Sequence, residues 1–398
     1  MMTRSAVLLI LLALSHAPGP DDARVRNGID VLVETDFKDL AGRRIGLISN
    51  HTGVDLQGTS TAVLLHRAKN LELVRLFSPE HGFEGKLDTK VGDSVHAATG
   101  LPIVSLYTET RAPSEANLEG IDTLVFDIQD IGCRFYTYIS TMGEAMRVAA
   151  RAGLRFVVLD RPNPINGIDV GGPVRDVGRS SFVAWHDLPL RHGMTVGELA
   201  RMFDAELSLE CDLQVIPMKG WKRHDFIDAT GQGWIDPSPN MRSPAQALLY
   251  PGVGLLETTN LSVGRGTDTP FEIIGAPWMD GPALARAIND AALPGLRCLS
   301  IRFTPRSSKH KGQPCSGIRF WVIDRARFDP ISLGFRLAWE LRRLHPDTWK
   351  IDRFDRLLVC KDIQDLFVVK APLSKILKRV RRDLGSFRQR RDRYLLYR

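Results

Sequence analysis

The feature that most constrains the fold is an alternation of short apolar runs with helical patterns between about residues 40 and 220. Six runs predict strands: RIGLIS (44–49), LELVRLF (71–77), PIVSLY (102–107), DTLVFDI (122–128), LRFVVLD (154–160) and LQVIPM (213–218). Segments with helical spacing lie between them, such as TAVLLHRAK, MGEAMRVAARA and TVGELARMFDAEL. Continuous apolar strands that alternate with amphipathic helices predict a parallel sheet covered on both faces, an α/β domain of Rossmann-like type.

The pattern changes beyond about residue 230. A long Gly- and Pro-rich stretch (234–278) carries many polar groups and few regular patterns, and stretches of this kind in compact proteins are usually functional. After it we expect a helix at 283–291, strands in LRCLSIRF and GIRFWVI, a helix near 331–344 and a basic terminal helix. We therefore predict a Rossmann-like domain at 24–250 and a smaller α+β domain at 251–398, which agrees with a length of 398 residues.

The amino terminus has the parts of a secretory signal peptide. One Arg precedes an apolar stretch from Ala6 to Leu14, and Ser15-His16-Ala17 offers a cleavage site after residue 17. The apolar stretch is too short to span a bilayer comfortably, and no later segment looks transmembrane. We expect residues 1–17 to be removed and the mature chain to be exported to the periplasm or the medium, without stable membrane insertion.

Cysteine spacing and charge exclude several classes of protein. The five cysteines form no Cys-x-x-Cys pair, which argues against a structural zinc site, and their odd number leaves at least one thiol unpaired within the chain. The last 24 residues hold ten Lys and Arg against two Asp, which more than accounts for the formal net charge of +7. Since no nucleic-acid-binding motif accompanies this segment, a solvated helix face is favoured over a nucleic-acid partner or a cell-wall anchor.

Polar residues follow four of the predicted strands. They are Asn50-His51, Glu80-His81, Asp127 to Asp130, and Asp160 to Asn163. In an open parallel sheet these strand ends lie at one edge, and ligands bind in the crevice outside it. The sequence therefore predicts a site at this edge.

Glu80 and His81 belong to the motif SPEHGFEG (78–85). A carboxylic acid at a strand end, beside glycines that let a ligand approach the backbone, can act as a general acid when partial burial raises its pKa. The alternative is a residue of a turn or a helix cap, and His81 alone is equally ambiguous.

FDIQDIGCRFYTY (126–138) supplies Asp127, Asp130, Arg134, Tyr136 and Tyr138. Carboxylates can orient sugar hydroxyls, Arg can pair with a carboxylate through two hydrogen bonds, and tyrosines offer flat faces with a polar tip. An Asp–Arg ion pair that pins a loop explains the same residues structurally.

LPLRHGMTVGELA (188–200) predicts a helix with Thr195 as N-cap and Glu198 completing a capping box, which leaves Arg191 and His192 unexplained. The stretches PSPNMRSP and ETTNLSVGRGTDTPFE contribute further polar residues: Asn240, Arg242, Glu257, Thr259, Asn260, Arg265, Thr267 and Glu272. The chain has no Gly-x-x-x-x-Gly-Lys-Ser/Thr loop, no Gly-x-Gly-x-x-Gly turn after the first strand and no His-Glu-x-x-His. We therefore predict neither a cofactor nor a metal.

Taken together, these motifs resemble the exo-β-N-acetylmuramidase family called NamZ. The matching runs are GLISNHTGVD, LFSPEHGFEG, VFDIQDIGCRFYTY, VLDRPNPING, LPLRHGMTVGELA, SPNMRSP with LYPGVGLLETTNLSVGRGTDTPFEIIGAPW, and RRDRYLLY. They cover nearly the whole predicted mature chain in order. The resemblance implies a Rossmann-like domain, a smaller carboxyl-terminal domain and an active-site cleft between them.

The resemblance also implies an activity, the release of non-reducing-terminal N-acetylmuramic acid from peptidoglycan fragments. Glu80 falls on the family's leading catalytic candidate, and we expect His81 and Asp127 to position or assist it. Arg134, Arg242 or Arg265 would suit the lactyl carboxylate of muramic acid, a choice that the sequence leaves open. The expected substrate-binding residues are Asn50, His51, Asp130, Arg134, Tyr138, Asn163, His192, Asn240, Arg242, Thr259, Asn260, Arg265 and Thr267.

One position departs from the family pattern. Relatives commonly read Val-Glu-Gly-Pro where this chain has Val170-Gly171-Gly172-Pro173, so a second carboxylate is missing there. Glycosidases usually use two acidic groups, and the second could be Asp127, Asp130 or the substrate's own 2-acetamido group. A slow or inactive member, in the form of a muropeptide-binding protein with the same cleft, is the alternative. An esterase or other hydrolase that uses the same cleft is a less supported alternative, since the chain lacks a Gly-x-Ser-x-Gly elbow.

Overall fold

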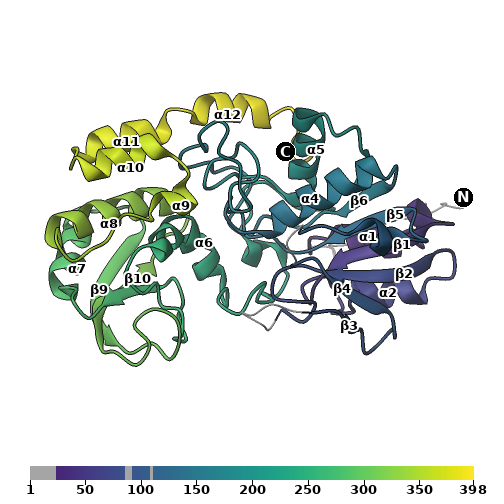
Figure 1. Ribbon diagram of the computed structural model, residues 1–398, viewed down its shortest axis with the longest axis horizontal. Helices are drawn as coiled ribbons and strands as arrows, with labels where there is room; N and C mark the ends of the chain where they lie inside the picture. Colours follow the sequence, from purple (N-terminus) through teal and green to yellow (C-terminus); the bar gives the residue numbers. More distant parts are fainter. Residues whose placement is uncertain (1–23, 86–91, 108–110) are drawn as a thin grey trace, which may run out of the picture.

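The computed structural model describes residues 24–85, 92–107 and 111–398. These residues form two lobes, each built around its own sheet (Figure 1). The predicted signal peptide at 1–17 lies outside the described residues. In the described part of the chain, no helix has the length and apolar character needed to cross a membrane.

The first lobe contains a seven-stranded sheet with the strand order β3-β4-β2-β1-β5-β6-β7. β3 is antiparallel to β4, and all other neighbours are parallel. The strands are β1 (Arg44–Ser49), β2 (Glu72–Ser78), β3 (Ser94–Val95), β4 (Pro102–Ser105), β5 (Thr123–Asp127), β6 (Arg155–Leu159) and β7 (Asp212–Ile216). The six predicted strands are confirmed to within two residues at each end, and the short edge strand β3 was not predicted.

Helices cover both faces of this sheet, as the continuous apolar strands predict. They are α1 (Gly28–Glu34), α2 (Thr61–Arg67), α3 (Glu115–Leu118), α4 (Tyr138–Arg151) and α5 (Val196–Leu207), with short 3₁₀ turns at η1 (Lys38–Leu40) and η2 (Ile227–Thr230). α1 and α2 share a buried cluster with Leu47, Val125 and Val157. α4 and α5 belong to the cluster that contains Phe126 and Phe156, the alternate residues of the same strands. The predicted capping box at Thr195 and Glu198 begins α5.

The second lobe contains a three-stranded antiparallel sheet with the order β8-β10-β9. Its elements are α6 (Pro244–Val253), η3 (Gly254–Thr258), β8 (Ile273–Ala276), α7 (Gly281–Asp290), β9 (Leu296–Phe303), β10 (Cys315–Val322) and α8 (Pro330–Leu344). The predicted helices and strands of this lobe are confirmed. α6 and β8 lie in the stretch for which we expected few regular elements, because Pro and Gly punctuate both segments.

The carboxyl-terminal part contains α9 (Asp355–Leu358), α10 (Lys361–Val368), α11 (Leu373–Arg381) and α12 (Leu384–Arg391). The single terminal helix that we predicted is thus two helices, α11 and α12. After α12 the chain returns to the first lobe and ends beside α5 (Figure 1). There the amide of Leu396 donates to Glu198 (2.9 Å) and the hydroxyl of Tyr397 donates to Asp160 (2.6 Å).

The core is continuous between the lobes. One buried cluster includes residues of the first sheet, α6, the second sheet and the carboxyl-terminal helices. α6 itself crosses the predicted domain boundary at 250/251 and packs on α8, where Gly252 and Gly334 are in close backbone contact. All five cysteines are free thiols, and only Cys211 is not buried.

Candidate active site

A polar cavity with a volume of about 920 Å³ lies between the carboxyl edge of the first sheet and the second lobe. Residues of both lobes line it: Glu80, His81, Phe135, Tyr136, Thr137, Ser238, Asn240, Tyr250, Glu257, Thr259, Asn260, Arg265, Phe271, Lys309, Lys350, Asp352, Arg353 and Arg356, among others. Five Lys and Arg side chains face three carboxylates in this lining, so the cavity is suited to a polar ligand that carries negative charge.

Glu80 lies two residues beyond the end of β2, in a sharp turn. His81 and Gly82 both have a positive φ, 72° and 76°, which turns the chain immediately after the carboxylate. Thr137, at the amino terminus of α4, donates its hydroxyl hydrogen to Glu80 Oε2 at 2.7 Å. The hydroxyl of Tyr107 also hydrogen-bonds to Glu80, and burial together with this carboxylate raises the pKa of Tyr107. Two neutral hydroxyls therefore hold the Glu80 carboxyl at the cavity wall.

His51 supports the turn that carries Glu80. Its amide donates to the carbonyl of Phe83 at 2.8 Å, and its Nε2 is 2.7 Å from the carbonyl of Asp236. The imidazole packs so closely on Gly85 that a Cβ there would lie 1.8 Å from the ring, and Gly85 also has a φ of +65°. Glycine is therefore required at 85, and His51 connects the turn to the 236–241 segment.

The lining contains a second glutamate, Glu257, which lies in η3, directly after α6. Arg265 pairs with Glu257 through its Nε, and Lys309 Nζ donates to the Glu257 carbonyl. Burial lowers the pKa of Lys309. Glu257 is thus held by a cation, whereas the contacts of Glu80 named above are with neutral hydroxyls.

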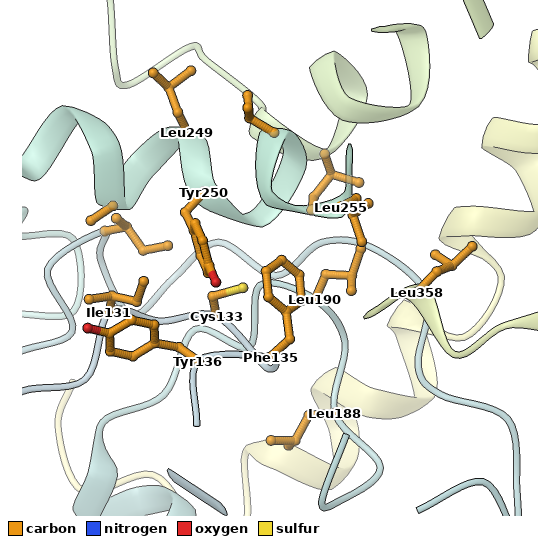
Figure 2. Packing of buried hydrophobic residues seen from close by; sticks show 14 of the residues in the cluster. Ile131, Cys133, Phe135, Tyr136, Leu188, Leu190, Leu249, Tyr250, Leu255 and Leu358 are labelled. Atoms are coloured by element: carbon orange, nitrogen blue, oxygen red, sulfur yellow. The ribbon is translucent and has the colours of Figure 1, made fainter. Parts of the chain in front are cut away.

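Aromatic side chains form the apolar part of the wall. Tyr250 packs edge-to-face against Phe271 (ring centroids 4.6 Å apart) and in a tilted arrangement against Phe135 (5.0 Å). Figure 2 shows Tyr250 descending from α6 towards Cys133, Phe135 and Tyr136. Burial raises the pKa of the Tyr250 phenol well above its usual value, so this residue is a neutral part of the wall. This packing joins the Glu80 side of the cavity to the Glu257 side.

The structure brings six of the predicted site residues together in this cavity. They are Glu80, His81, Asn240, Thr259, Asn260 and Arg265. Asn260 also accepts the amide hydrogen of Lys350 at 2.7 Å, which fixes the loop that carries Lys350.

Asp127 does not line the cavity, contrary to our expectation. Its carboxylate is fully buried and forms a two-point ion pair with Arg161 (Nε–Oδ1 2.5 Å, Nη2–Oδ2 2.9 Å). Thr61 donates a further hydrogen bond to Oδ2 at 2.5 Å. The last residue of a central strand points its side chain into the protein here, so the geometry supports a structural role and gives no support to assistance at the reacting atoms.

Two of the three arginines considered for the lactyl carboxylate also lie elsewhere. The guanidinium of Arg134 is fully buried and donates to the carbonyls of Pro173, Leu188, Leu357 and Leu358. Burial lowers its pKa to about 10. Arg242 is exposed and donates to the carbonyls of Pro239 and Thr267. Of the three, only Arg265 lines the cavity.

The remaining predicted binding residues belong to the framework around the cavity. They are Asn50, His51, Asp130, Tyr138, Asn163, His192 and Thr267, and none of them lines the cavity in the described part of the chain. Tyr138 donates to the carbonyl of Pro237 at 2.6 Å. His192 is fully buried, with Nε2 3.4 Å from Asp130 Oδ2. These side chains hold loops in place at the sheet edge.

Several cavity residues were not predicted as site residues. Thr137 lines the cavity and stands in the FDIQDIGCRFYTY motif, where only its neighbours were singled out. Tyr107 contacts Glu80 from beyond the end of the neighbouring strand β4, outside any motif named above. Glu257 was noted in the sequence without a role. Lys309, Lys350 and Arg353 come from loops of the second lobe and Arg356 from α9, and the approach of these segments to the first lobe depends on tertiary packing.

Gly171 lies away from this cavity. It forms paired backbone hydrogen bonds with Arg191, and a Cβ at 171 would lie 2.8 Å from Ile331 Cγ1. The residue lines a separate cavity beside α8 and α11. The absence of a carboxylate at 171 therefore removes no acidic group from the lining of the Glu80 cavity.

One group of described residues has ligand atoms close enough for a metal ion, Asp176, Cys360 and Asp362. Arg379 already occupies this position, because its Nη2 donates to Cys360 Sγ at 3.1 Å and its Nε pairs with Asp362. Burial raises the pKa of the Cys360 thiol, which disfavours the thiolate that a metal needs. The guanidinium satisfies the acidic side chains without an ion.

The chain is similar to proteins of one family along its length. Family models described as "Exo-beta-N-acetylmuramidase NamZ, N-terminal" and "C-terminal" match residues 45–245 and 248–397. The chain is 40% identical over 379 residues to the peptidoglycan β-N-acetylmuramidase NamZ of Bacillus subtilis strain 168, covering 94% of this chain and 92% of that protein.

Solved structures agree. Crystal structures of two DUF1343 family proteins from Bacteroides fragilis NCTC 9343 superpose with TM-scores of 0.89 and 0.76, at 39% and 31% identity. Each comparison covers 94% of this chain, and 100% and 99% of the respective relatives. The chain therefore belongs to the NamZ exo-β-N-acetylmuramidase family.

Proposed function

We propose that this protein is an exo-acting glycoside hydrolase that releases non-reducing-terminal N-acetylmuramic acid from peptidoglycan fragments. The observation that carries the proposal is the placement of Glu80 in the wall of a cavity with five cationic side chains. Muramic acid differs from the neighbouring sugar by its anionic lactyl group, and a cation-rich cavity complements that charge. Family membership supports the same reaction.

Glu80 acts as the general acid in this proposal. Its carboxyl is held by the hydroxyls of Thr137 and Tyr107, and hydroxyl partners can hydrogen-bond to a protonated carboxyl as well as to a carboxylate. A group that delivers a proton to the glycosidic oxygen must be stable in both forms. His81, which also lines the cavity, lies beside it in the same turn.

We assign the second acidic role to Glu257. It lies in the lining of the same cavity, and its pairing with Arg265 suits a group that works as a carboxylate, either as the base for water or as the nucleophile. The substrate's 2-acetamido group is the alternative source of a nucleophile. Asp127 and Asp130, the earlier candidates, do not line the cavity.

A turnover assay with defined saccharides tests this function. We expect the wild-type protein to release free N-acetylmuramic acid from the non-reducing end of a muramyl disaccharide and from a chromogenic muramide, and to leave the matching N-acetylglucosaminides intact. Calorimetric binding of the disaccharide without any turnover would instead establish a muropeptide-binding protein and overturn the enzymatic assignment.

A second experiment decides between the two sources of the second group. If Glu257 acts as proposed, Glu257→Gln lowers kcat by at least about a hundredfold. Unimpaired turnover by this variant, with retention of configuration at the released anomeric carbon, would assign the nucleophile to the 2-acetamido group instead.

We also propose that the protein acts outside the cytoplasm. Residues 1–17 support this through the charged, apolar and small-residue segments of a signal peptide. Amino-terminal sequencing of protein expressed with its full leader tests the proposal. A mature chain that begins at residue 18 is expected, and an intact leader on protein in the cytosolic fraction would overturn it.

A further inference from the structure

A second polar cavity of about 320 Å³ lies at the carboxyl edge of the first sheet. In the strand order, β2 lies on one side of β1 and β5 on the other. The chain adds strands on the β2 side first and then crosses over to the β5 side, so a topological switch point lies between β1 and β5. Crevices outside the carboxyl ends of strands at such a switch point are the usual ligand sites of open α/β sheets. The lining residues that matter here are Asn27, Asp55, Gln129, Arg161, Gln232 and Trp234.

This cavity is separate from the Glu80 cavity. The described linings of the two cavities share no residue. They lie on either side of one segment, since residues 231–235 line the second cavity and Ser238, Asn240 and Met241 line the first. Trp234 Nε1 donates to the Met241 carbonyl at 3.2 Å, which holds the indole at the wall of the second cavity.

Arg161 supplies a hydrogen-bond donor to the second cavity. Its Nε and Nη2 bind the two oxygens of Asp127, and Nη2 also donates to the Val54 carbonyl at 2.9 Å. Nη1 has no hydrogen-bond partner in the part of the chain that the structure describes, although the side chain is only 4% exposed. Because Asp127 neutralises the guanidinium, Arg161 offers directed N–H groups without a net positive charge.

Fixed acceptors complete the lining. Gln129 donates both Nε2 hydrogens, to the carbonyls of Asp130 (2.7 Å) and Pro162 (2.8 Å), which leaves its Oε1 as the group that can serve a ligand. Asp55 Oδ1 accepts the amide hydrogens of Gln57 and Thr59, which fixes that carboxylate. Asn27 and Gln232 hydrogen-bond to each other through their amides.

We propose that this second cavity binds a neutral sugar ring. Each sugar hydroxyl both donates and accepts a hydrogen bond, which matches planar, fixed donors and acceptors beside an indole against which the apolar C–H groups of a pyranose can pack. The volume is that of a small-ligand site. Since Asp127 neutralises Arg161, the other charged groups of the lining are one cation, Arg24, and one carboxylate, Asp55. The cavity therefore has no excess positive charge to attract an anion, in contrast to the cation-rich Glu80 cavity.

Calorimetric titration of the whole protein with N-acetylglucosamine tests the proposal. The choice of this probe rests on the proposed function, because N-acetylglucosamine is the neutral sugar next to muramic acid in peptidoglycan. Hydrolysis is measured in a separate assay, so sugar binding in the second cavity and muramidase activity can each fail without the other. We expect saturable binding that weakens on the order of tenfold in Trp234→Leu, the effect of losing one aromatic contact. The matched control is Trp321→Leu on β10, an indole 41% exposed and absent from both linings, which should leave the affinity unchanged.

Asp55→Asn provides a second variant that preserves the fold, because an amide oxygen can still accept the hydrogens of Gln57 and Thr59. We expect weaker binding here as well, since an acceptor oxygen is replaced by a donor. Saturating N-acetylmuramic acid should not displace N-acetylglucosamine. The proposal is overturned by absence of binding up to about 10 mM, by equal affinity in both cavity variants and the wild type, or by competitive displacement with N-acetylmuramic acid.

Discussion

The carboxylates at the ends of β2 and β5 lie in different surroundings, although both strands are direct neighbours of β1. Glu80 lines the cavity and Asp127 does not. Asp127 is the last residue of β5, and its side chain is fully buried against Arg161. Glu80 lies two residues past β2, where the left-handed backbone of His81 and Gly82 turns the chain at the cavity. Two residues of turn beyond the strand thus separate a site residue from a framework residue.

The hydrogen-bond partners of the two carboxylates also differ: Glu80 is bonded to the hydroxyls of Thr137 and Tyr107, and Asp127 to the guanidinium of Arg161. Asp127 and Arg161 form a buried ion pair, and removing either partner leaves an uncompensated buried charge, so the pair is part of the framework. A carboxyl bonded to hydroxyls can exchange a proton with a ligand.

Glu80→Gln should have the largest effect on activity. We expect kcat on a chromogenic muramide to fall by roughly two to four orders of magnitude, the usual scale for loss of a general acid, because the amide cannot donate the proton. The melting temperature should stay near that of the wild type, since Gln can still accept the Thr137 hydrogen bond. Unimpaired turnover by the variant would remove Glu80 from the mechanism.

Asp127→Ala should act on stability instead. Leaving Arg161 buried without its counter-ion is expected to lower the free energy of unfolding by about 3–5 kcal/mol, measured by urea denaturation. Protein that remains folded should turn over within about tenfold of the wild-type rate, below the effect of a lost general acid. A stable variant with a hundredfold lower kcat would show that Asp127 takes part in the reaction and would erase the contrast with Glu80.

The sequence predicts the first sheet well, because its central strands are continuous apolar runs whose burial decides their structure. β5 is buried at every position, and β1 at every position except the first. The sequence also places polar residues correctly at the carboxyl edge. It cannot tell Glu80 from Asp127, because the direction of each side chain depends on the turn geometry and on the arrival of Arg161 from the end of β6.

The second lobe shows a different limit of prediction. Lys309 and Lys350 reach the cavity only because β9, β10 and α8 position their loops across from the first sheet, and no local pattern encodes that approach. Asn240, Thr259, Asn260 and Arg265 were identified through motifs in the Gly/Pro-rich stretch. Arg242 comes from the same stretch and Arg134 from FDIQDIGCRFYTY (126–138), yet their hydrogen bonds to main-chain carbonyls were not visible in the sequence.

Arg265→Ala tests which arginine serves the lactyl carboxylate. We expect kcat/KM for the muramide to fall by roughly 10- to 100-fold, the range for a hydrogen bond to a charged group, because the variant loses the contact with the lactyl carboxylate and the ion pair that holds Glu257. Arg242→Ala is the matched control, because Arg242 lies outside the cavity lining, and its effect should be below about threefold. Equal losses in the two variants would contradict this assignment.

Asp160, directly after β6, is a third carboxylate at this edge of the sheet, and the hydrogen-bond partners named below are hydroxyls and an amide. It accepts hydrogen bonds from Thr195 (2.8 Å), Gly197 (2.8 Å) and Tyr397 (2.6 Å), and burial raises its pKa to about 7. The folded protein therefore holds a proton between about pH 4 and 7 that the unfolded chain has released. The free energy of unfolding should fall as pH rises through this window, by up to about 1.4 kcal/mol per pH unit, and level off above it.

Asp160→Asn should remove this part of the pH dependence of the free energy of unfolding, because the amide does not titrate. Urea denaturation of both proteins at several values between pH 5 and 7.5 measures the difference in slope, while other titrating groups contribute equally to both. Parallel curves for the two proteins would mean that Asp160 ionises normally in the fold.

Gly171→Glu should have the smallest effect on activity, even though it introduces the carboxylate that the family resemblance led us to expect at this position. The added side chain would contact Ile331, outside the Glu80 cavity. We therefore expect kcat on the chromogenic muramide to stay within about twofold of the wild type. Overpacking against Ile331 should lower the free energy of unfolding by about 1–3 kcal/mol. Gly171→Ala is the control, because it introduces the same contact without a carboxylate. A rise in kcat of tenfold or more with Glu but not with Ala would show that a carboxylate at 171 reaches the reacting atoms, and would place the second acidic group there instead of at Glu257.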